Sequence, residues 1–475
     1  MDNLLLTLPE LILSIGAIVL MLVAAWRGDD ATPAISVAAV ALIVAAGFAV
    51  ALPPAGFGDG FDGLYRGDAF AAFAKILIYA ATAVAIIIAP RFFATGDRLR
   101  AEYPILILFA TTGAGMMVSA ADLITLYIGL ELQSLASYVL ASFMRRDARS
   151  AEAGLKYFVL GALASGILLY GMSLVYGFTG TTTYDGIARV FDAGLTTGQL
   201  FGLVFVFAGL AFKVAAVPFH MWTPDVYEGA PTPVTTLFAT AQKVAAMAML
   251  VRIAVEAMGS ATLEWRQIVI FAALASIILG AVGAIGQSNI KRLLAYSSIN
   301  NVGFALIGLA AGTREGVAAV LVYLAIYVVM TIGSFLCVLQ MRDADGRPVE
   351  SISSLSGLSQ SRKGLAAALA IFMFSLAGIP PLFGFWAKFV VFDAAVAAGL
   401  LPLAAIGIAA SVIGAFYYLK IIKTMYFDEP AAEYAKAGSK LENGLIAACA
   451  VFIVFGYLFI PALGNEAAAA ASALF

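Results

Sequence analysis

Charged side chains are scarce in this sequence: Asp, Glu, Lys and Arg make up 12% of its 475 residues, whereas 63% are hydrophobic. Water-soluble globular proteins are about a quarter charged. The composition therefore excludes the ordinary soluble classes and predicts a chain embedded in lipid. The formal net charge is −2, so the sequence lacks the basic excess typical of nucleic-acid-binding proteins, and we expect no nucleic-acid partner.

Residues that ligate metals and haem are also rare. The chain has two cysteines, Cys337 and Cys449, which lie far apart in apolar runs, and one histidine, His220. This inventory excludes a disulfide framework, a chain-held iron–sulfur cluster and a bis-histidine haem. No Walker loop is present, and the glycines of residues 280–286 have the wrong spacing for a dinucleotide loop. We therefore expect this chain to bind no redox cofactor and no metal, and its glycines to allow close helix packing.

Long apolar runs fill the remaining sequence. A bilayer core about 30 Å thick is crossed by about 20 apolar residues in a helix. On this measure we predict an all-α integral membrane protein with about fourteen transmembrane helices. The predicted spans are residues 3–26, 33–52, 69–93, 104–120, 122–143, 154–178, 199–222, 232–257, 266–288, 293–311, 316–340, 364–396, 400–426 and 443–465.

The basic residues between these spans predict the orientation. Of the 27 lysines and arginines, 18 fall in odd-numbered loops, among them Arg98 and Lys436, and 5 fall in even-numbered loops. Because loops rich in lysine and arginine stay in the cytoplasm, the odd-numbered loops are predicted to be cytoplasmic. Both termini are then expected on the outer side of the membrane.

Four lysines remain inside the spans: Lys75, Lys213, Lys243 and Lys388. Glu131 is the one acidic residue well inside a span. An ionised group at the bilayer centre costs at least about 2.5–3.5 kcal/mol, so such groups face a polar interior, pair, or lose their charge. A lysine whose carboxylate partner approaches and withdraws is a switchable proton holder.

A structural interpretation stands beside this one. A lysine–glutamate pair can also serve as a fixed contact between helices. Lys75 lies close to the end of its span, so we interpret it as a residue whose ammonium reaches the membrane surface along its aliphatic stem.

Two of the predicted spans are interrupted, and each carries a buried lysine. The span over 364–396 would be about 50 Å long as a straight helix, and it contains Gly378-Ile-Pro-Pro381. The span over 199–222 contains Lys213 followed by Pro218. Backbone breaks at membrane depth are tolerated beside protein or a water-filled cavity, and paired breaks are typical of inverted-repeat transporters. The alternative is a pair of packing kinks.

Other polar residues along these spans have two interpretations each. His220 fits either a proton relay or a satisfied polar residue near a helix end. Asp225 and Glu228, after the seventh span, fit proton collection or a solvated turn. The polar residues within 288–301 fit a hydrated path beyond Lys243 or the capping and joining of helices.

Several segments together resemble the antiporter-like membrane subunits of respiratory complex I. These are Thr7-Leu-Pro-Glu10-Leu11, residues 129–138, residues 212–233, residues 291–298 and Gly378-Ile-Pro-Pro381. The resemblance implies a single membrane domain with two inverted five-helix repeats, spans 4–8 and 9–13. The repeats would cover residues 104–257 and 266–426, preceded by N-terminal helices in 1–103 and followed by a C-terminal helix and tail in 443–475. Lys388 and the short sequence after the last span favour one branch of this family.

The same resemblance implies site residues. Glu131 corresponds to the helix-5 carboxylate, Lys213 to the helix-7 lysine paired with it, and Lys243 to the central helix-8 lysine. Lys388 corresponds to the terminal helix-12 lysine. These residues would move protons from the cytoplasm to the outside of the bacterial inner membrane. NADH, FMN, iron–sulfur clusters and quinone would be bound by partner subunits of the membrane-embedded complex.

Three alternatives remain open at this point. A sodium–proton antiporter subunit would share most of these motifs. A membrane scaffold without its own channel would use the same charges to hold helices together. Binding of lipid or quinone at the helix breaks is the third.

Overall fold

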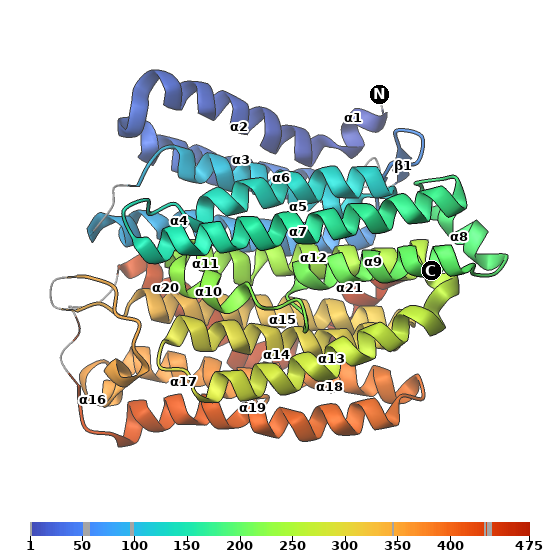
Figure 1. Ribbon diagram of the computed structural model, residues 1–475. Coiled ribbons are helices and arrows are strands. Elements are labelled where there is room, and N and C mark those ends of the chain that lie inside the picture. Colours follow the sequence, from blue (N-terminus) through green and yellow to red (C-terminus); the bar gives the residue numbers. More distant parts are fainter. Residues whose placement is uncertain (1, 51–57, 96–98, 344–345, 432–433, 435–438) are drawn as a thin grey trace.

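The computed structural model describes residues 2–50, 58–95, 99–343, 346–431, 434 and 439–475. These residues form a bundle of helices that run back and forth along one axis, with both chain ends at the same end of the bundle (Figure 1). The expected all-helical membrane architecture is confirmed. Arg98, Lys436 and the last two residues of the span expected over 33–52 lie outside the described residues.

The helices before the first predicted repeat form one edge of the bundle. They are α1 (Asp2–Leu6), α2 (Leu8–Arg27), the 3-10 turn η1 (Gly28–Ala31), α3 (Thr32–Val50), α4 (Ala69–Phe92) and the 3-10 turn η2 (Phe93–Thr95). A small hairpin joins α3 to α4, in which β1 (Gly58–Gly60) pairs antiparallel with β2 (Tyr65–Gly67).

The next segment contains several short helices as well as long ones. They are α5 (Glu102–Ser119), α6 (Leu123–Ala141), α7 (Ala148–Thr179), α8 (Tyr184–Asp192), α9 (Thr197–Val214), α10 (Thr223–Gly229), α11 (Thr232–Ala239), α12 (Ala241–Arg252) and the π-helical turn η3 (Ile253–Ala257).

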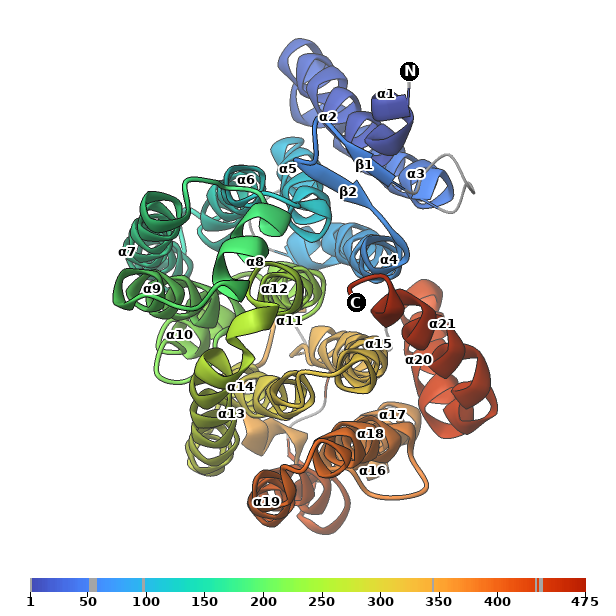
Figure 2. The ribbon, with the colours of Figure 1, turned by 90° about the vertical axis from the view of Figure 1, so that its right-hand side faces the viewer.

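The remaining elements complete the bundle. They are η4 (Gly259–Ala261), α13 (Thr262–Ile285), α14 (Ile290–Ala310), α15 (Arg314–Leu339), η5 (Ile352–Leu355), α16 (Leu358–Ser361), α17 (Lys363–Ala377), α18 (Phe383–Ala397), α19 (Leu401–Phe427), α20 (Lys440–Phe455), η6 (Gly456–Phe459) and α21 (Ile460–Ser472). Seen along the axis, α20 and α21 return along one side to lie beside α15 and α4 (Figure 2).

By length and composition, the described residues contain 12 candidate membrane spans. One of them, Leu8–Val50, holds both α2 and α3, and the apolar α17 is too short to be included. The stretches containing α11–α12, α14 and α15 are the most deeply buried of the candidates. Their side chains are surrounded by other helices rather than by lipid, so polar groups on them face protein.

Both expected helix breaks are present. The span predicted over 199–222 is helical as far as Val214, after which Ala215 adopts a left-handed conformation with φ 61°. The span predicted over 364–396 is divided into α17 and α18 by the proline-containing segment 378–382. In both places proline removes a backbone donor, so the helix cannot continue through it.

A third break was not expected. The span predicted as one helix over 232–257 is divided at Thr240 into α11 and α12, and it ends in the π-helical turn η3. The Thr240 hydroxyl donates to the Thr236 carbonyl oxygen at 2.6 Å. This type of threonine hydrogen bond bends helices, and no proline or glycine at this position signals it in the sequence.

Glycines set the closest approach between helices. A Cβ on Gly113 of α5 would lie 2.5 Å from the Gly129 carbonyl oxygen of α6. On the other side of the bundle, a Cβ on Gly280 of α13 would lie 2.6 Å from the Asn300 nitrogen of α14. The interpretation of residues 280–286 as a packing motif is consistent with this contact, since small residues let helix backbones approach in membranes.

We expect Gly113→Ala to destabilise the protein by about 1–3 kcal/mol, because an added methyl group has no space between α5 and α6. Thermal unfolding of the purified protein in detergent measures the effect. Gly166→Ala on α7 is the matched control, since no heavy atom lies within 4 Å of its added Cβ. Equal changes in unfolding temperature for the two variants would contradict the close-packing argument.

Candidate functional site

Lys243, a residue of α12, places its ammonium at the end of the broken helix α9. It is 3% exposed, and its Nζ donates to the carbonyl oxygen of Val214, the last residue of α9, at 2.7 Å. The indole Nε1 of Trp222 donates to the Phe212 carbonyl oxygen of the same turn at 3.0 Å. The Phe212 carbonyl also accepts from the backbone N–H of Ala215, so Trp222 adds a second donor there, whereas Lys243 supplies the donor that the last carbonyl of α9 would otherwise lack.

Lys388 makes the corresponding contact at the second break. It is 7% exposed, and its Nζ donates to the carbonyl oxygen of Ala377, the last residue of α17, at 3.0 Å. The Ser411 hydroxyl lies 3.4 Å away, and the ammonium stands 4.4 Å from the centre of the Phe304 ring. Gly378 has φ 82° and an added Cβ would lie 2.9 Å from the Lys388 side chain, so both the turn and the contact require glycine here.

The two breaks therefore share one arrangement: a buried ammonium on the last carbonyl of a half-helix. The C-terminal end of a helix carries a partial negative charge from its aligned peptide dipoles. This partial charge stabilises a cation where a full carboxylate is absent. The aromatic faces of Trp222 beside Lys243 and Phe304 beside Lys388 contribute further attraction.

Lys213 and Glu131 lie near each other but do not form the direct pair that the family resemblance implied. The Lys213 Nζ donates to the Ser134 hydroxyl at 2.7 Å. Ser134 is three residues beyond Glu131 on α6, so it lies on the same helix face. One carboxylate oxygen of Glu131 is buried without a hydrogen-bond partner. In this structure the Lys213 ammonium therefore has a hydroxyl acceptor, and its pairing with Glu131 stays a prediction.

Within the described part of the chain, no carboxylate lies within 4.0 Å of the Lys213, Lys243 or Lys388 ammonium. Four other lysines do have such partners: Lys75, Lys156, Lys291 and Lys423. The lysines at the helix breaks and beside Ser134 thus have neutral acceptors, whereas the others are held in ion pairs.

A network of hydroxyl and amide groups lies on α14, whose Phe304 faces Lys388. The Tyr323 hydroxyl donates to Asn301 Oδ1 at 2.7 Å, and Tyr327 donates to Ser298 Oγ at 3.0 Å. Ser297 hydrogen-bonds with Tyr418 of α19. Of the polar residues within 288–301, Asn289 caps α14, whereas Ser297, Ser298 and Asn301 belong to this buried network. The tyrosines were missed in the sequence because they lie among apolar residues.

His220 lies in the turn between α9 and α10, half-buried, and its Nδ1 is buried without a hydrogen-bond partner. It follows α9 in the sequence, but within the described residues it forms no hydrogen bond to Lys213 or Lys243. Both interpretations of His220 therefore stay predictions.

Lys75 does not reach the membrane surface, so its interpretation as an outward-reaching residue is wrong. It is 4% exposed, and its Nζ lies 2.7 Å from Glu10 Oε1. The Tyr65 hydroxyl of β2 accepts from Lys75 at 2.7 Å and donates to Glu10 at 2.8 Å. Packing of α4 and α2 against α5 places the side chain beside a buried carboxylate rather than beside lipid headgroups.

Arg252, within the span predicted over 232–257, is another buried charge. It is 1% exposed at the end of α12, donates to Asp68 at 2.7 Å and pairs with Glu256 at 2.8 Å. Its guanidinium also donates to the Val118 carbonyl oxygen at 3.0 Å. This contact network ties α12 to α4 and α5.

Asp225 lies on the short helix α10 rather than in a turn, and its partly exposed carboxylate belongs to an ion-pair network. Asp225 accepts from Lys156 at 2.7 Å and from Arg292 at 2.5 Å. Burial raises the pKa of Asp225, but these hydrogen bonds outweigh burial and hold that pKa below its usual value. The carboxylate therefore stays charged at neutral pH, which disfavours proton collection by Asp225.

Lys291 and Glu350 form the buried part of the same network. Lys291 is 2% exposed and its Nζ lies 3.1 Å from Glu350 Oε1. Burial raises the pKa of Glu350, but the Lys291 ammonium and the hydrogen bond from Asn289 outweigh it, and the pKa lies below its usual value. Sequence reasoning placed Lys291 in a loop and missed this pair.

We expect Glu350→Gln to destabilise the protein by about 3–5 kcal/mol at neutral pH, because Lys291 is left buried without its carboxylate. A lowered pKa gives stability that is present above the usual carboxylate pKa of about 4.3 and is lost as the pH falls through the folded-state pKa. The loss on acidification should therefore be smaller in the variant. Thermal unfolding at a series of pH values tests this, with Glu466→Gln, an exposed residue, as the control. Identical pH dependence in Glu350→Gln and the parent would contradict it.

The comparisons with known proteins agree with this geometry. Residues 120–414 match the family model described as NADH:quinone oxidoreductase/Mrp antiporter, TM. NADH-quinone oxidoreductase subunit N of Rhizorhabdus wittichii is 70% identical, covering 100% of this chain and 99% of that protein. The subunit N of Sphingopyxis alaskensis is 62% identical, covering 98% of each chain.

A solved structure extends the comparison to three dimensions. A chain of respiratory complex I from Thermus thermophilus with bound aureothin superposes with a TM-score of 0.82 at 30% identity. The match covers 96% of this chain and 99% of that chain. The chain therefore belongs to the NADH:quinone oxidoreductase/Mrp antiporter membrane family and, within it, to the subunit N group, the branch that Lys388 favoured.

Proposed function

We propose that this chain is a proton-translocating subunit in the membrane arm of a bacterial NADH–quinone oxidoreductase. It moves protons from the cytoplasm to the outside along an axis of Glu131, Lys213, Lys243 and Lys388. Electron transfer from NADH to quinone takes place in partner subunits, which hold NADH, FMN, iron–sulfur clusters and quinone. The chain lies in the inner membrane with both termini on the periplasmic side.

The observation that carries this proposal is the pair of lysines on the last carbonyls of two half-helices. Burial in a medium of low dielectric favours the neutral amine, whereas the helix end favours the ammonium. A lysine held between these opposing effects changes its charge when either effect changes. A lysine closed into a buried ion pair, such as Lys75 with Glu10, lacks this freedom because proton loss would strand the carboxylate.

Glu131 supplies the variable charge at the start of the axis. One of its carboxylate oxygens is buried without a hydrogen-bond partner, and the Lys213 ammonium donates to Ser134 on the same helix instead. Movement of α6 relative to α9 that closes the pair would favour the ammonium of Lys213, and opening would release its proton toward Lys243. Since Lys213 is part of the last turn of α9 and the Lys243 ammonium, from α12, contacts that turn, a change in the turn acts on both.

The α14 network offers hydroxyl groups for the next part of the path. Asn301 and Ser297 on α14 bond to tyrosines of α15 and α19, and Phe304 on the same helix faces Lys388. Water molecules among these groups would complete the transfer from Lys243 to Lys388.

The free energy needed to move a proton across the membrane is similar in size to the free energy that a change in ion pairing supplies. Moving one charge against 100 mV requires about 2.3 kcal/mol. A change of two units in the pKa of a lysine supplies about 2.7 kcal/mol. An approach and withdrawal of a carboxylate is therefore sufficient in size to drive one proton.

We further propose fourteen spans, with inverted repeats over residues 104–257 and 266–426. Two similarities between these segments support the assignment. Each begins with a closely packed helix pair, α5 with α6 and α13 with α14. Each also contains a half-helix that ends inside the bundle, α9 in one and α17 in the other, and these two run in opposite directions (Figure 1).

Replacing Lys243 by alanine removes the ammonium at the end of α9. In complexes that assemble normally, we expect the proton translocation per NADH oxidised to fall at least about tenfold, because positioned proton-transfer groups contribute about 10²–10⁴-fold. Fluorescence quenching of a pH probe in inverted membrane vesicles, recorded with NADH oxidation, measures this ratio. Lys420→Ala, an exposed lysine on α19, is the control and should leave the ratio unchanged. A normal ratio in Lys243→Ala would remove this lysine from the path.

Glu131→Gln keeps the side-chain shape but removes the variable charge. We expect this variant to assemble normally on a native gel and to translocate fewer protons. Ser134→Ala removes only the hydroxyl that accepts from Lys213, so we expect a smaller reduction in proton translocation. Glu466→Gln controls for loss of a carboxylate elsewhere. If Glu131→Gln blocks assembly before activity, the scaffold alternative gains support, and sodium-dependent transport in a complex-free preparation would favour the antiporter alternative.

A further inference from the structure

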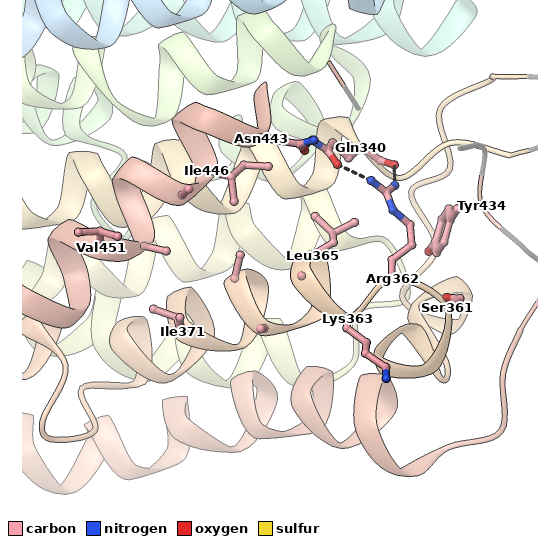
Figure 3. A pocket seen from close by; sticks show the side chains of 15 residues that line it. Gln340, Ser361, Arg362, Lys363, Leu365, Ile371, Tyr434, Asn443, Ile446 and Val451 are labelled. Carbon is pink, nitrogen blue, oxygen red and sulfur yellow. Dashed lines mark hydrogen bonds between the residues drawn. The ribbon is translucent and has the colours of Figure 1, made fainter. Parts of the chain in front are cut away.

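A groove between α17 and α20 is not used by the proton path. Its volume is about 850 Å³, within the range of small-molecule sites, about 300–1,000 Å³. Leu365 and Ile371 of α17 line one wall, and Ile446 and Val451 of α20 line the other (Figure 3). Alanines at positions 367, 368, 447 and 450 widen the space between them. The groove thus offers an apolar channel along the helices.

One end of the groove is polar and positively charged. Arg362 donates to the Gln340 carbonyl oxygen at 3.1 Å and to Gln340 Oε1 at 2.6 Å (Figure 3). The Gln340 amide in turn donates to Asn443 Oδ1 at 2.7 Å. Lys363 follows in the chain and also lines the groove. These contacts fix the guanidinium at the groove's end through neutral acceptors.

No carboxylate of the described residues lies within 4.0 Å of Arg362 or Lys363. The nearby Glu442 is already engaged by Arg91 at 2.6 Å. Burial lowers the pKa of Arg362, and the positive charge of Arg91 lowers it further against the opposing effect of Glu442. The cations at this end therefore repel one another and outnumber the anions, so a bound anion would be stabilised.

We propose that this groove binds an anionic phospholipid, with its phosphate on Arg362 and one acyl chain along α17 and α20; the exposed Lys363, whose side chain points away from the guanidinium, adds positive charge at the same end (Figure 3). Basic pockets between transmembrane helices on the cytoplasmic side are suited to anionic headgroups. A free phosphate ion would leave the apolar walls uncovered, and an uncharged quinone head would leave the cations unmatched. A zwitterionic lipid carries its own positive group into the same cluster. The amphipathic anion is the occupant that matches both ends of the groove.

The proposed lipid would also stabilise the position of the half-helix α17. The helix α17 is the half-helix whose last carbonyl accepts from Lys388. An acyl chain packed between α17 and α20 would fill the groove and hold the half-helix against its neighbour. The site is distinct from the axis of lysines, since none of them lines the groove.

Retention of lipid by the purified complex tests the proposal. The delipidated complex is incubated with dioleoylphosphatidylglycerol or dioleoylphosphatidylcholine, washed, and the lipid bound per complex is counted by mass spectrometry. We expect the parent to retain one more phosphatidylglycerol than the double variant Arg362→Gln/Lys363→Gln, which should bind that lipid at least about tenfold more weakly. Phosphatidylcholine should not occupy the site.

A steric variant tests the apolar part without changing the charges. Ala447 lines the groove and its exposed neighbour Ala448 does not, so Ala447→Phe should displace the lipid whereas Ala448→Phe should retain it. Lys420→Gln is the charge control and should also retain it. Equal phosphatidylglycerol counts in all variants, equal retention of phosphatidylcholine, or recovery of quinone in place of phospholipid would overturn the proposal.

Discussion

Inside a membrane, a helix that stops must find partners for its last carbonyl oxygens, because no solvent supplies them. A buried lysine has the complementary need, because its ammonium requires acceptors where lipid offers none. In this protein the two requirements meet twice, at Val214 with Lys243 and at Ala377 with Lys388. Each break is stabilised by a cation, and each cation is tolerated because of a break.

This arrangement separates two kinds of buried charge. Lys75 and Lys291 each have a carboxylate partner, and Arg252 has two. Such closed pairs connect elements, as Glu10–Lys75 does for α2 and α4. The lysines of the proposed path have hydroxyl or carbonyl acceptors instead. A neutral acceptor stabilises the ammonium less than a carboxylate does, so the charge state of these lysines responds more readily to their surroundings.

The charged networks lie toward the ends of the helices, where they fix the frame around the path. Lys156, Asp225 and Arg292 connect α7, α10 and α14. At the other end, Arg252 connects α12 to Asp68 before α4. These ion pairs hold the ends of neighbouring helices together on both sides of the proposed path. The basic end of the α17–α20 groove would extend such charge contacts to the proposed lipid.

The sequence by itself determined the membrane architecture, since scarce charge and long apolar runs leave no other class. It also located the breaks at Pro218 and at Pro380-Pro381 and the lysines beside them, because proline and intramembrane charge are local signals. The tertiary structure alone decided which groups meet. Lys75 pairs with Glu10 instead of reaching the membrane surface, Lys213 donates to Ser134, and Thr240 interrupts a segment that the sequence predicts to be one helix. The physical reason is that helices apolar on nearly all sides carry no periodicity that tells which face is turned inward, so the rotation and neighbours of each helix are set by packing of the whole bundle.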